Sequence, residues 1–433
     1  MNISRRKFII GSGSLICSAS LAGLTSCNKF HREIQTENIS VLQNDNYLKN
    51  NVENLKDFNI NVAESANKFL SSFPNYQATP LISLENLAKE LDVSAIYIKD
   101  ESKRFDLNAF KVTGASFAMG KYIASKIGKE INDINYKEMV SNEVRKKLGQ
   151  ITFVTATDGN HGRAVAWTAN KLGQKAVVYM PKGSSLERLN NIKAEGADAS
   201  IMTLSYDDCV RLAMSNAQKN GWFLIQDTAL DGYVDVPTNI MQGYTNIYYE
   251  ILNQLDNAEF THVFLQAGVG SFSSAITAAI TNHCNKNNKQ IPKFIIVEPS
   301  SSNCIYKTAY ENNGQLQTIK DDMDSIMAGL NCGEPSPIAW DILNNFTFRY
   351  CSISDEITKI GMRVLAKPYG NDTQVVSGES GACTLGLLYE VLHNQDLGSI
   401  KESLEIDSNS RILCISTEGN TDKASYETII NSN

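Results

Sequence analysis

Residues 152–172 read TFVTATDGNHGRAVAWTANKL, and this stretch decides the expected architecture of the chain. It begins with Thr152 to Thr155, a short run of strand-forming side chains. Val165, Ala169 and Leu172 then recur at helical spacing, after two glycines that permit a tight turn. A strand that turns directly into a covering helix is the repeating unit of a parallel sheet.

The same alternation continues on both sides of this unit. Further apolar runs predict buried strands, with amphipathic helical stretches between them, at residues 95–99, 176–180, 199–203, 222–226, 262–266, 293–297 and 411–415. The sequence therefore indicates an α/β protein whose parallel strands are covered by helices on both faces. Such sheets bind ligands at the carboxyl ends of their strands, so the loops there are the candidate sites.

The composition excludes several classes of protein. Of 433 residues, 42% are hydrophobic and 20% are charged, which is typical of globular chains and not of disordered or multi-span membrane proteins. The net charge of −7 gives no support to nucleic acid binding. The nine cysteines and five histidines show no zinc-site spacing, and no GxSxG elbow of a serine hydrolase follows a strand.

The first 27 residues indicate an export signal that ends in a lipid anchor. The pair Arg5–Arg6 precedes a moderately apolar stretch, residues 9–24, and this pattern resembles a twin-arginine signal. The stretch is shorter and more polar than a typical spanning helix. Residues 24–27, LTSC, resemble a bacterial lipobox, in which Cys27 receives the lipid. The alternative is a chance arginine pair before an uncleaved apolar segment.

The mature chain is therefore expected in the cell envelope, anchored to a membrane only through the lipid on Cys27. Asn28 follows that cysteine, where retention at the inner membrane commonly uses aspartate, so the outer membrane is the expected location. Residues 28–73 are polar and rich in asparagine, and they predict a tether with a few arm-like segments.

The first candidate site is Lys111, between Phe110 and Val112 and just ahead of a predicted helix. Burial lowers the pKa of a lysine, and a neutral amine forms a Schiff base with an aldehyde. A lysine whose stem lies along the edge of a helix is the commoner case. On this segment alone, the structural interpretation is favoured.

Two glycine-containing loops follow predicted strands. In residues 155–163, Asn160 offers an amide and the helix N-terminus favours an anion, although Asp and Asn are also good N-caps. Residues 266–273, QAGVGSFS, present backbone amides and hydroxyls that could bind a phosphate. The second loop also matches part of a dinucleotide-binding motif, with Glu298 ending the next strand, but Ser273 replaces its third glycine.

A fourth loop, residues 415–422, reads ISTEGNTD after the last predicted strand. A hydroxyl at Ser416 or Thr417 could hydrogen-bond a pyridine nitrogen, or it could cap the next helix.

In chain order the four loops carry KDES, RF, LNAFK, TDGNHGR, QAGVGS and STEGNTD. This order resembles the pyridoxal-phosphate enzymes of the tryptophan synthase β-subunit fold, and within them the diaminopropionate ammonia-lyases. Further matching runs are VYMPKGS (178–184), QDTA (226–229), IMQGY (240–244), IMAGLNCGE (326–334), Asn371-Asp372 and SGESGA (377–382). The resemblance covers about residues 76–428. Asp106, where the family commonly has glycine, is one of a few departures, with Thr113, Ala115 and Leu230.

The resemblance implies two α/β domains, a large cofactor-binding domain of residues 74–120 and 240–433 and a small domain of residues 121–239. It also implies a homodimer. Lys111 would hold pyridoxal 5′-phosphate covalently and Asn160 would contact its ring oxygen. The phosphate would bind the backbone of Gly268, Val269, Gly270 and Ser271, and either Ser416 or Thr417 would meet the ring nitrogen. The pattern does not decide between those two hydroxyls.

The implied reaction is the α,β-elimination that converts 2,3-diaminopropionate into pyruvate and two ammonia, a carbon–nitrogen lyase activity in amino acid catabolism. Asp158 and Asp227 occupy the family's acidic positions, and a nearby carboxylate keeps a leaving amine protonated. An N-cap for Asp158 and a turn for Asp227 are the structural alternatives. A serine or threonine dehydratase, or a lipoprotein that binds the cofactor or amino acids without turnover, remain alternative functions.

An exported protein meets oxidising conditions, so a disulfide between Cys304 and Cys332 is expected. Cys332 lies in the glycine-rich run GLNCGE.

Overall fold

The computed structural model describes residues 32–256, 259–321 and 323–432. The strands are β1 (Glu33–Gln35), β2 (Ile39–Gln43), β3 (Leu81–Ser83), β4 (Ala95–Asp100), β5 (Thr152–Ala156), β6 (Lys175–Met180), β7 (Asp198–Ile201), β8 (Phe223–Leu224), β9 (His262–Gln266), β10 (Lys293–Pro299), β11 (Thr347–Ile353) and β12 (Arg411–Ser416).

The α-helices are α2 (Ile60–Leu70), α3 (Glu85–Glu90), α4 (Val112–Lys126), α5 (Tyr136–Met139), α6 (Asn142–Leu148), α7 (Asn160–Lys171), α8 (Leu186–Ala194), α9 (Tyr206–Asn220), α10 (Asp235–Gln254), α11 (Ser271–Lys286), α12 (Cys304–Glu311), α13 (Pro337–Phe346), α14 (Asp355–Ala366), α15 (Glu379–His393), α16 (Gly398–Leu404) and α17 (Lys423–Asn431). Short 3-10 helices are η1 (Glu53–Phe58), η2 (Glu101–Asp106), η3 (Ile131–Asp133), η4 (Ala328–Leu330) and η5 (Gln395–Leu397).

The large sheet has the strand order β1-β2-β11-β10-β9-β12-β4-β3. Its central strands, from β11 to β4, run parallel, and β2 and β3 pair antiparallel with the outermost of them. Along β9, Val263 and Leu265 pack into the core on one face of the sheet and Phe264 packs into the core on the other. This alternation is the two-residue period of a strand buried on both faces, so the expected α/β class is confirmed.

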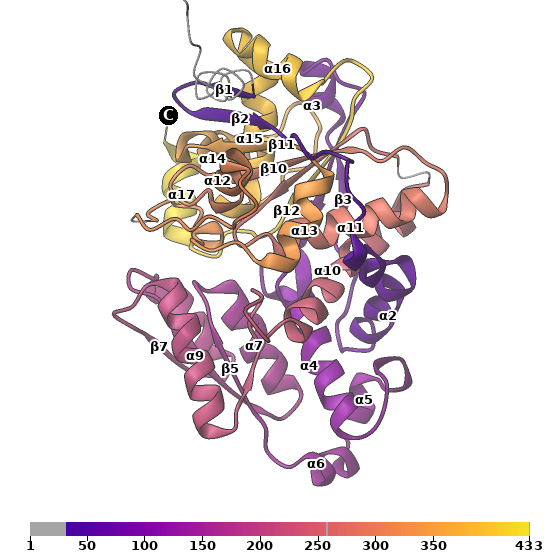
Figure 1. Ribbon diagram of the computed structural model, residues 1–433, viewed down its shortest axis with the longest axis vertical. Coiled ribbons are helices and arrows are strands. Elements are labelled where there is room, and N and C mark those ends of the chain that lie inside the picture. Colours follow the sequence, from indigo (N-terminus) through magenta and orange to yellow (C-terminus); the bar gives the residue numbers. More distant parts are fainter. Residues whose placement is uncertain (1–31, 257–258, 322, 433) are drawn as a thin grey trace, which may run out of the picture.

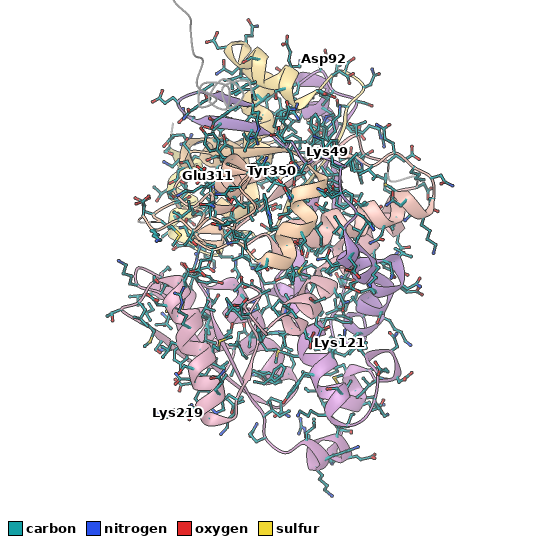
Figure 2. The ribbon with its side chains drawn as sticks, in the orientation of Figure 1. Lys49, Asp92, Lys121, Lys219, Glu311 and Tyr350 are labelled. Carbon is teal, nitrogen blue, oxygen red and sulfur yellow. The ribbon has the colours of Figure 1, made fainter. Side chains whose placement is uncertain are left out.

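The small sheet, β7-β6-β5-β8, is parallel throughout. It occupies the lower part of the molecule, with α4 beside it and α10 above α4 (Figure 1). Helix α10 contacts both α4 and α11. Lys219, near the end of α9, lies on the side of the small sheet away from the large one, whereas Tyr350 of β11 is buried in the large sheet (Figure 2). Strand ends of both sheets, after β5 in the small sheet and after β9 and β12 in the large one, lie at one cavity.

The N-terminal segment differs from the expected tether. From Glu33 onward it adds β1 and β2 to the large sheet, and β2 pairs antiparallel with β11 through Val41 and Cys351. Helix α2 follows, and it buries Ala66 and Phe69 together with their neighbours on one face. The apolar positions of α2 recur at helical spacing within a polar segment, which explains why the composition alone suggested a tether.

Within the described ranges, no helix combines the length and the apolar character that crossing a membrane requires. Residues 1–27, including the predicted signal and Cys27, lie outside the described residues.

Candidate active site

The loops after β5, β9 and β12 and the N-terminal ends of α4, α7 and α11 line one cavity. The side chains and backbone around it belong to Phe110, Lys111, Thr157, Asp158, Asn160, His161, Tyr206, Asp227, the segment 266–272, Gly329, Leu330, Cys332, Ser380, Thr417 and Glu418. All of the candidates taken from the sequence are among them except Ser416, which lies elsewhere, and Cys27, which falls outside the described residues.

Lys111 directly precedes α4 and is held there by the loop after β12. The backbone N–H of Phe110 donates to the carbonyl of Thr417 at 3.1 Å. Ala109 forms an antiparallel bridge with Glu418. The segment that carries the lysine therefore runs beside the candidate hydroxyl of Thr417.

The Nζ of Lys111 donates to the Oδ2 of Asp227 at 2.5 Å. The lysine side chain is 20% exposed and the aspartate side chain 4%. Burial alone would lower the pKa of Lys111, but the Asp227 carboxylate outweighs burial and raises that pKa. Burial would likewise raise the pKa of Asp227, and the lysine lowers it instead. A carboxylate that is distant in sequence therefore outweighs the burial that would by itself have lowered the lysine pKa.

Asp227 also contacts an uncharged histidine and a tyrosine. The Nε2 of His161 lies 2.9 Å from the carbonyl of Ile225 and therefore carries the proton, which leaves Nδ1 as the nitrogen 3.9 Å from Asp227 Oδ2. Burial lowers the pKa of His161. The hydroxyl of Tyr206 lies 3.5 Å from the other carboxylate oxygen. Lys111 is therefore the charged partner of Asp227 among these neighbours.

Asp158 places a second carboxylate in the cavity, just after β5. Its Oδ2 is buried without a hydrogen bond to any described residue. The closest cation is the guanidinium of Arg188, whose NH1 lies 3.9 Å away. Burial raises the pKa of Asp158, and Arg188 opposes that shift in part.

Asn160 begins α7, and its Nδ2 donates to the Oε2 of Glu418. Glu418 is buried, and its Oε1 accepts from the backbone N–H of Ser380 at 3.0 Å. The carboxylate therefore fixes which end of the Asn160 amide faces it. The second N–H of that amide is left to donate to a ligand.

The segment 268–271 leads into α11 and suits an anion. Gly270 adopts a φ of +94°, in the left-handed region that favours glycine. A Cβ at Gly268 would lie 3.0 Å from the Sγ of Cys332, so a side chain there would crowd the loop. No described side chain caps the N-terminus of α11, and its first N–H groups are free to bind a phosphate.

The two hydroxyls after β12 have different surroundings. Ser416 is buried and donates to the Oγ of Ser377 at 2.7 Å, away from the cavity walls. Thr417 lines the cavity, and its Oγ1 accepts from the Nε2 of Gln266 at 2.9 Å. A hydroxyl that accepts one hydrogen bond can still donate its own proton, here into the cavity, where a neutral pyridine nitrogen would accept it.

These groups fit pyridoxal phosphate. The cavity offers an amine for an aldehyde, an amide for the ring oxygen, an uncapped helix N-terminus for the phosphate and a hydroxyl donor for the ring nitrogen. Among the described residues, no cluster of His, Cys, Asp or Glu side chains is arranged to hold a metal ion.

The expected disulfide is absent, since Cys304 and Cys332 are both free and buried. The thiol of Cys304 donates to the carbonyl of Gly268 at 3.7 Å. Burial raises the pKa of both thiols, which disfavours the thiolate that disulfide exchange needs.

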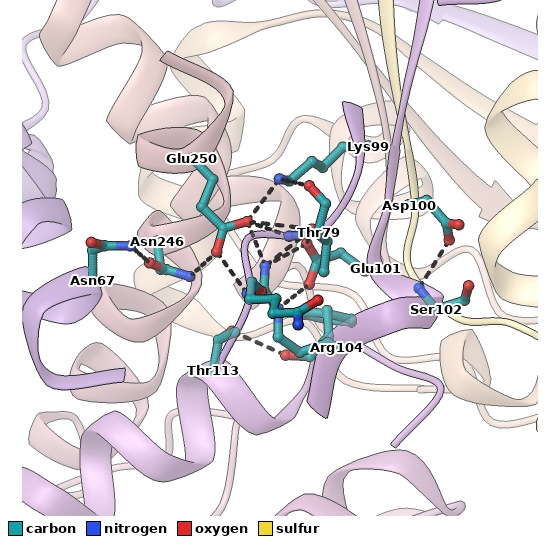
Figure 3. Close-up of polar contacts among 12 residues, drawn as sticks. Asn67, Thr79, Lys99, Asp100, Glu101, Ser102, Arg104, Thr113, Asn246 and Glu250 are labelled. Atoms are coloured by element: carbon teal, nitrogen blue, oxygen red, sulfur yellow. Dashed lines mark hydrogen bonds and ion pairs between the residues drawn. The ribbon is translucent and has the colours of Figure 1, made fainter. Parts of the chain in front are cut away.

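The KDES (99–102) and RF (104–105) motifs do not line the cavity. Lys99, Glu101 and Arg104 form a buried ionic network with Glu250 of α10 and with Thr79 (Figure 3). Their resemblance to a family motif therefore reflects a structural cluster that precedes Lys111 in the chain.

Several residues of the cavity were not identified as functional candidates from the sequence. His161, Gln266 and Glu418 lie inside the motifs that were quoted, so their polar side chains at strand ends were the available signal. Cys332 lies in the quoted run 326–334 but was considered only for a disulfide. Tyr206 lies outside every quoted motif, and only the fold brings it to Asp227.

Comparison with known proteins agrees with this geometry. Residues 73–418 match the family model of pyridoxal-phosphate dependent enzymes. The diaminopropionate ammonia-lyase of Salmonella typhimurium is 46% identical over 86% of this chain and 92% of its own length, and that of Escherichia coli is 42% identical over 86% and 92%.

Solved structures show the same likeness. The Escherichia coli diaminopropionate ammonia-lyase in complex with D-serine superposes with a TM-score of 0.84 and 39% identity, covering 91% of this chain and 97% of the other. A threonine deaminase from Solanum lycopersicum, at 18% identity and a TM-score of 0.66, covers 92% and 98% and shares the fold. The chain therefore belongs to the pyridoxal-phosphate dependent enzymes, in the family of the diaminopropionate ammonia-lyases.

Proposed function

We propose that the protein converts 2,3-diaminopropionate and water into pyruvate and two ammonia. The observation that carries this proposal is the pair of carboxylates, Asp158 and Asp227, in one cavity with Lys111. The substrate has two amino groups, and the β-amino group leaves readily only when it is protonated. A carboxylate beside it stabilises the protonated form.

The cofactor supplies an electron sink that makes the α-proton of the bound amino acid acidic. Lys111 would hold it covalently, and Asn160 would donate to its ring oxygen. The backbone of 268–271 would bind its phosphate at the start of α11. Thr417, and not Ser416, would donate to the ring nitrogen, because Ser416 is bonded to Ser377.

Asp227 is poised to become a base once Lys111 is engaged. Lys111 is the main influence that lowers the pKa of Asp227, and burial acts in the opposite direction. When the amine is no longer a free ammonium, the carboxylate loses its partner and its affinity for a proton rises. Water is restricted at Asp227, whose side chain is 4% exposed, so a proton taken from the substrate stays in the site.

The two carboxylates would serve the two enantiomers. The α-protons of L- and D-diaminopropionate point to opposite faces of the bound substrate, so use of both isomers needs a base on each face. We assign Asp227 to the L-isomer and Asp158 to the D-isomer, as the family resemblance implies. The acid that does not take the α-proton is then available to keep the leaving amine protonated.

The decisive experiment measures ammonia and pyruvate together. Purified protein loaded with cofactor should release about two ammonia per pyruvate from diaminopropionate, by the balanced equation. A serine dehydratase would release one ammonia from serine, and turnover of serine alone would contradict the proposal.

Asp227→Asn should lower kcat/KM for the L-isomer by at least about 100-fold, and Asp158→Asn should lower kcat/KM for the D-isomer by as much, since acid–base groups contribute about 100-fold or more. Equal, small losses for both isomers would contradict the assignment.

We also propose that the enzyme works as a homodimer, exported through the twin-arginine signal and lipidated at Cys27 in the outer membrane. A route that carries folded proteins would let the cofactor be bound in the cytoplasm before export. Two acyl chains on Cys27 would anchor it durably. Replacing both Arg5 and Arg6 by lysine should leave active enzyme in the cytoplasm, and normal export of that variant would contradict this route. Light scattering of the mature chain tests the dimer.

A further inference from the structure

Arg188, in α8, brings a nearly buried guanidinium to the edge of the cavity. Its side chain is 9% exposed, and its Nε has no hydrogen-bond partner among the described residues. Its NH1 lies 3.9 Å from the Oδ2 of Asp158, which also has no such partner. Buried polar groups are normally satisfied, so a carboxylate oxygen without a partner beside a guanidinium whose Nε also lacks one calls for an explanation.

The backbone beside Asp158 is shaped around this arginine. A Cβ at Gly159 would lie 3.0 Å from the Cδ of Arg188 and 3.4 Å from its Cβ and Cγ. Gly159 also adopts a φ of +157°, at the limit of the region that other residues avoid. The aliphatic stem of Arg188 therefore occupies the space that a side chain would fill, and it brings the guanidinium to the neighbouring carboxylate.

The other groups around Asp158 do not replace Arg188 as its cation. Lys111, at the start of α4, is already bonded to Asp227, and Glu418, after β12, repels a second carboxylate. Tyr206 in α9 and Cys332 beside η4 also feel the charge of Asp158, and burial keeps both of them protonated. Glu418, Glu379 and Asp422 also act on the Arg188 guanidinium, and Glu418 does so more strongly than Asp158. Arg188 is nevertheless the cation whose side chain comes within 4 Å of the Asp158 carboxylate among the described residues.

We infer that Arg188 is a positioning residue for Asp158: it keeps this carboxylate charged and oriented toward the cavity, so that Asp158 can accept a proton from the substrate. The inference rests on the proposed function, in which Asp158 acts on the D-isomer. Arg188 does not itself line the cavity, so it acts through Asp158 and not on the substrate.

The pH dependence of kcat/KM for the two isomers distinguishes an effect of Arg188 on Asp158 from an effect on the whole site. In Arg188→Gln, the acid limb of kcat/KM for D-diaminopropionate should move up by about one pH unit, which is a tenfold loss on that limb. The profile for the L-isomer should stay within about twofold, because Arg188 lies beside Asp158 and the side chains that act on Asp227 are Lys111 and His161. Arg188→Lys should restore most of the D-isomer profile. Lys193→Gln, which removes an exposed positive charge from the same helix, should change neither profile.

A readout without turnover tests the same pair. In protein labelled with 13C at the aspartate carboxyl carbons, Asp158→Asn identifies the resonance of Asp158, and its titration can be followed without cofactor. Arg188→Gln should move that titration to higher pH, and Arg188→Lys should largely restore it.

The outcomes distinguish the inference from the proposed function. If Asp158→Asn leaves D-isomer turnover unchanged, the assignment of Asp158 fails and the inference fails with it. If Asp158→Asn abolishes that turnover while Arg188→Gln moves neither the acid limb nor the carbon resonance, the inference alone is overturned. Equal shifts for both isomers also overturn it, because Arg188 would then act on the whole site.

Discussion

Lys99 is buried and Lys111 is half-buried, and each is paired with a carboxylate, yet their amines differ in how many hydrogen bonds they make. The Nζ of Lys99 donates to Glu250 Oε2 at 2.7 Å, to the Thr79 carbonyl at 2.7 Å and to Gln254 Oε1 at 2.8 Å, which uses all of its N–H groups. The Nζ of Lys111 donates to Asp227, and the lysine keeps 20% exposure to the cavity.

The arginine of the network is equally satisfied. Arg104 donates from Nε to Glu101, and from its terminal nitrogens to Glu101, Glu250, Thr79 and the Gln77 carbonyl. A lysine or arginine whose donors are all bonded has none left for a ligand. Burial and a paired carboxylate therefore do not by themselves single out a lysine that binds a ligand. What distinguishes Lys111 is an amine that keeps unused N–H groups beside a cavity, and this fits the role proposed for it.

Lys111→Ala removes the lysine of the pair with Asp227, and it should have the largest effect on activity. We expect kcat/KM to fall by at least about 10⁴-fold, or about 5.5 kcal/mol in transition-state stabilisation, together with loss of the absorbance of the bound cofactor. The unfolding free energy of the cofactor-free protein should change by less than about 2 kcal/mol, because Asp227 can take up a proton when its partner is removed. Turnover at the wild-type rate would refute the assignment of Lys111.

Lys99→Ala is the matched change in the pair of Lys99 with Glu250, where every N–H of the lysine is already bonded. It should lower the stability of the protein and leave its activity nearly unchanged. Removing one partner from a buried ionic network leaves uncompensated charge and costs about 3–5 kcal/mol. Urea unfolding measures this loss. The variant should keep its specific activity within about twofold under conditions where it is folded. A folded Lys99→Ala protein without activity would show that the network acts on the site as well as on stability.

The pH dependence of stability sharpens the comparison. Burial would raise the pKa of Glu250, but Arg104 and Lys99 lower it to about 2. A carboxylate with a lowered folded pKa stabilises the protein above its unfolded pKa of about 4.3, and this contribution is lost as pH falls through the folded pKa. The stability difference between wild type and Glu250→Gln should therefore shrink by about 3 kcal/mol between pH 5 and pH 2.

Urea unfolding at several pH values checks this expectation. Glu64→Gln, an exposed change on α2, should keep a small and nearly constant difference from wild type. If the difference in unfolding free energy between wild type and Glu250→Gln did not change with pH, Arg104 and Lys99 would not be holding Glu250 in its ionised form.

The strands could be predicted from the sequence where they are continuous apolar runs, as at 95–99 and 262–266. β11 was not predicted, because Arg349 interrupts its apolar pattern, and β2 was not predicted because it lies in an asparagine-rich segment. Strand order and the antiparallel edges depend on long-range pairing, which no local pattern encodes.

The site could be predicted only in part for the same reason. Lys111 and Asp227 are 116 residues apart, so their pairing, and the pKa that follows from it, is a property of the fold. Which of Ser416 and Thr417 faces the cavity depends on the path of the chain after β12: Thr417 lines the cavity, whereas Ser416 bonds Ser377. Arg188 carries no motif, and its role depends on the space beside Gly159.

The smallest expected effect on stability concerns the loop that joins Arg104 of the ionic network to Lys111. Between Arg104 and Lys111 the chain holds Phe105, Asp106 and Asn108 at positive φ, and Asp106 has a φ of +59°. Left-handed backbone costs an ordinary residue about 1–2 kcal/mol, less for aspartate, and glycine adopts it freely. Asp106→Gly relieves this strain but gives the unfolded chain more freedom, so we expect a net stabilisation of at most about 1 kcal/mol. Urea unfolding and the kcat/KM for diaminopropionate test it together. Higher stability with unchanged activity would show that the strain at Asp106 is incidental, whereas a clear loss of activity would show that the strained loop helps to hold Lys111 in place.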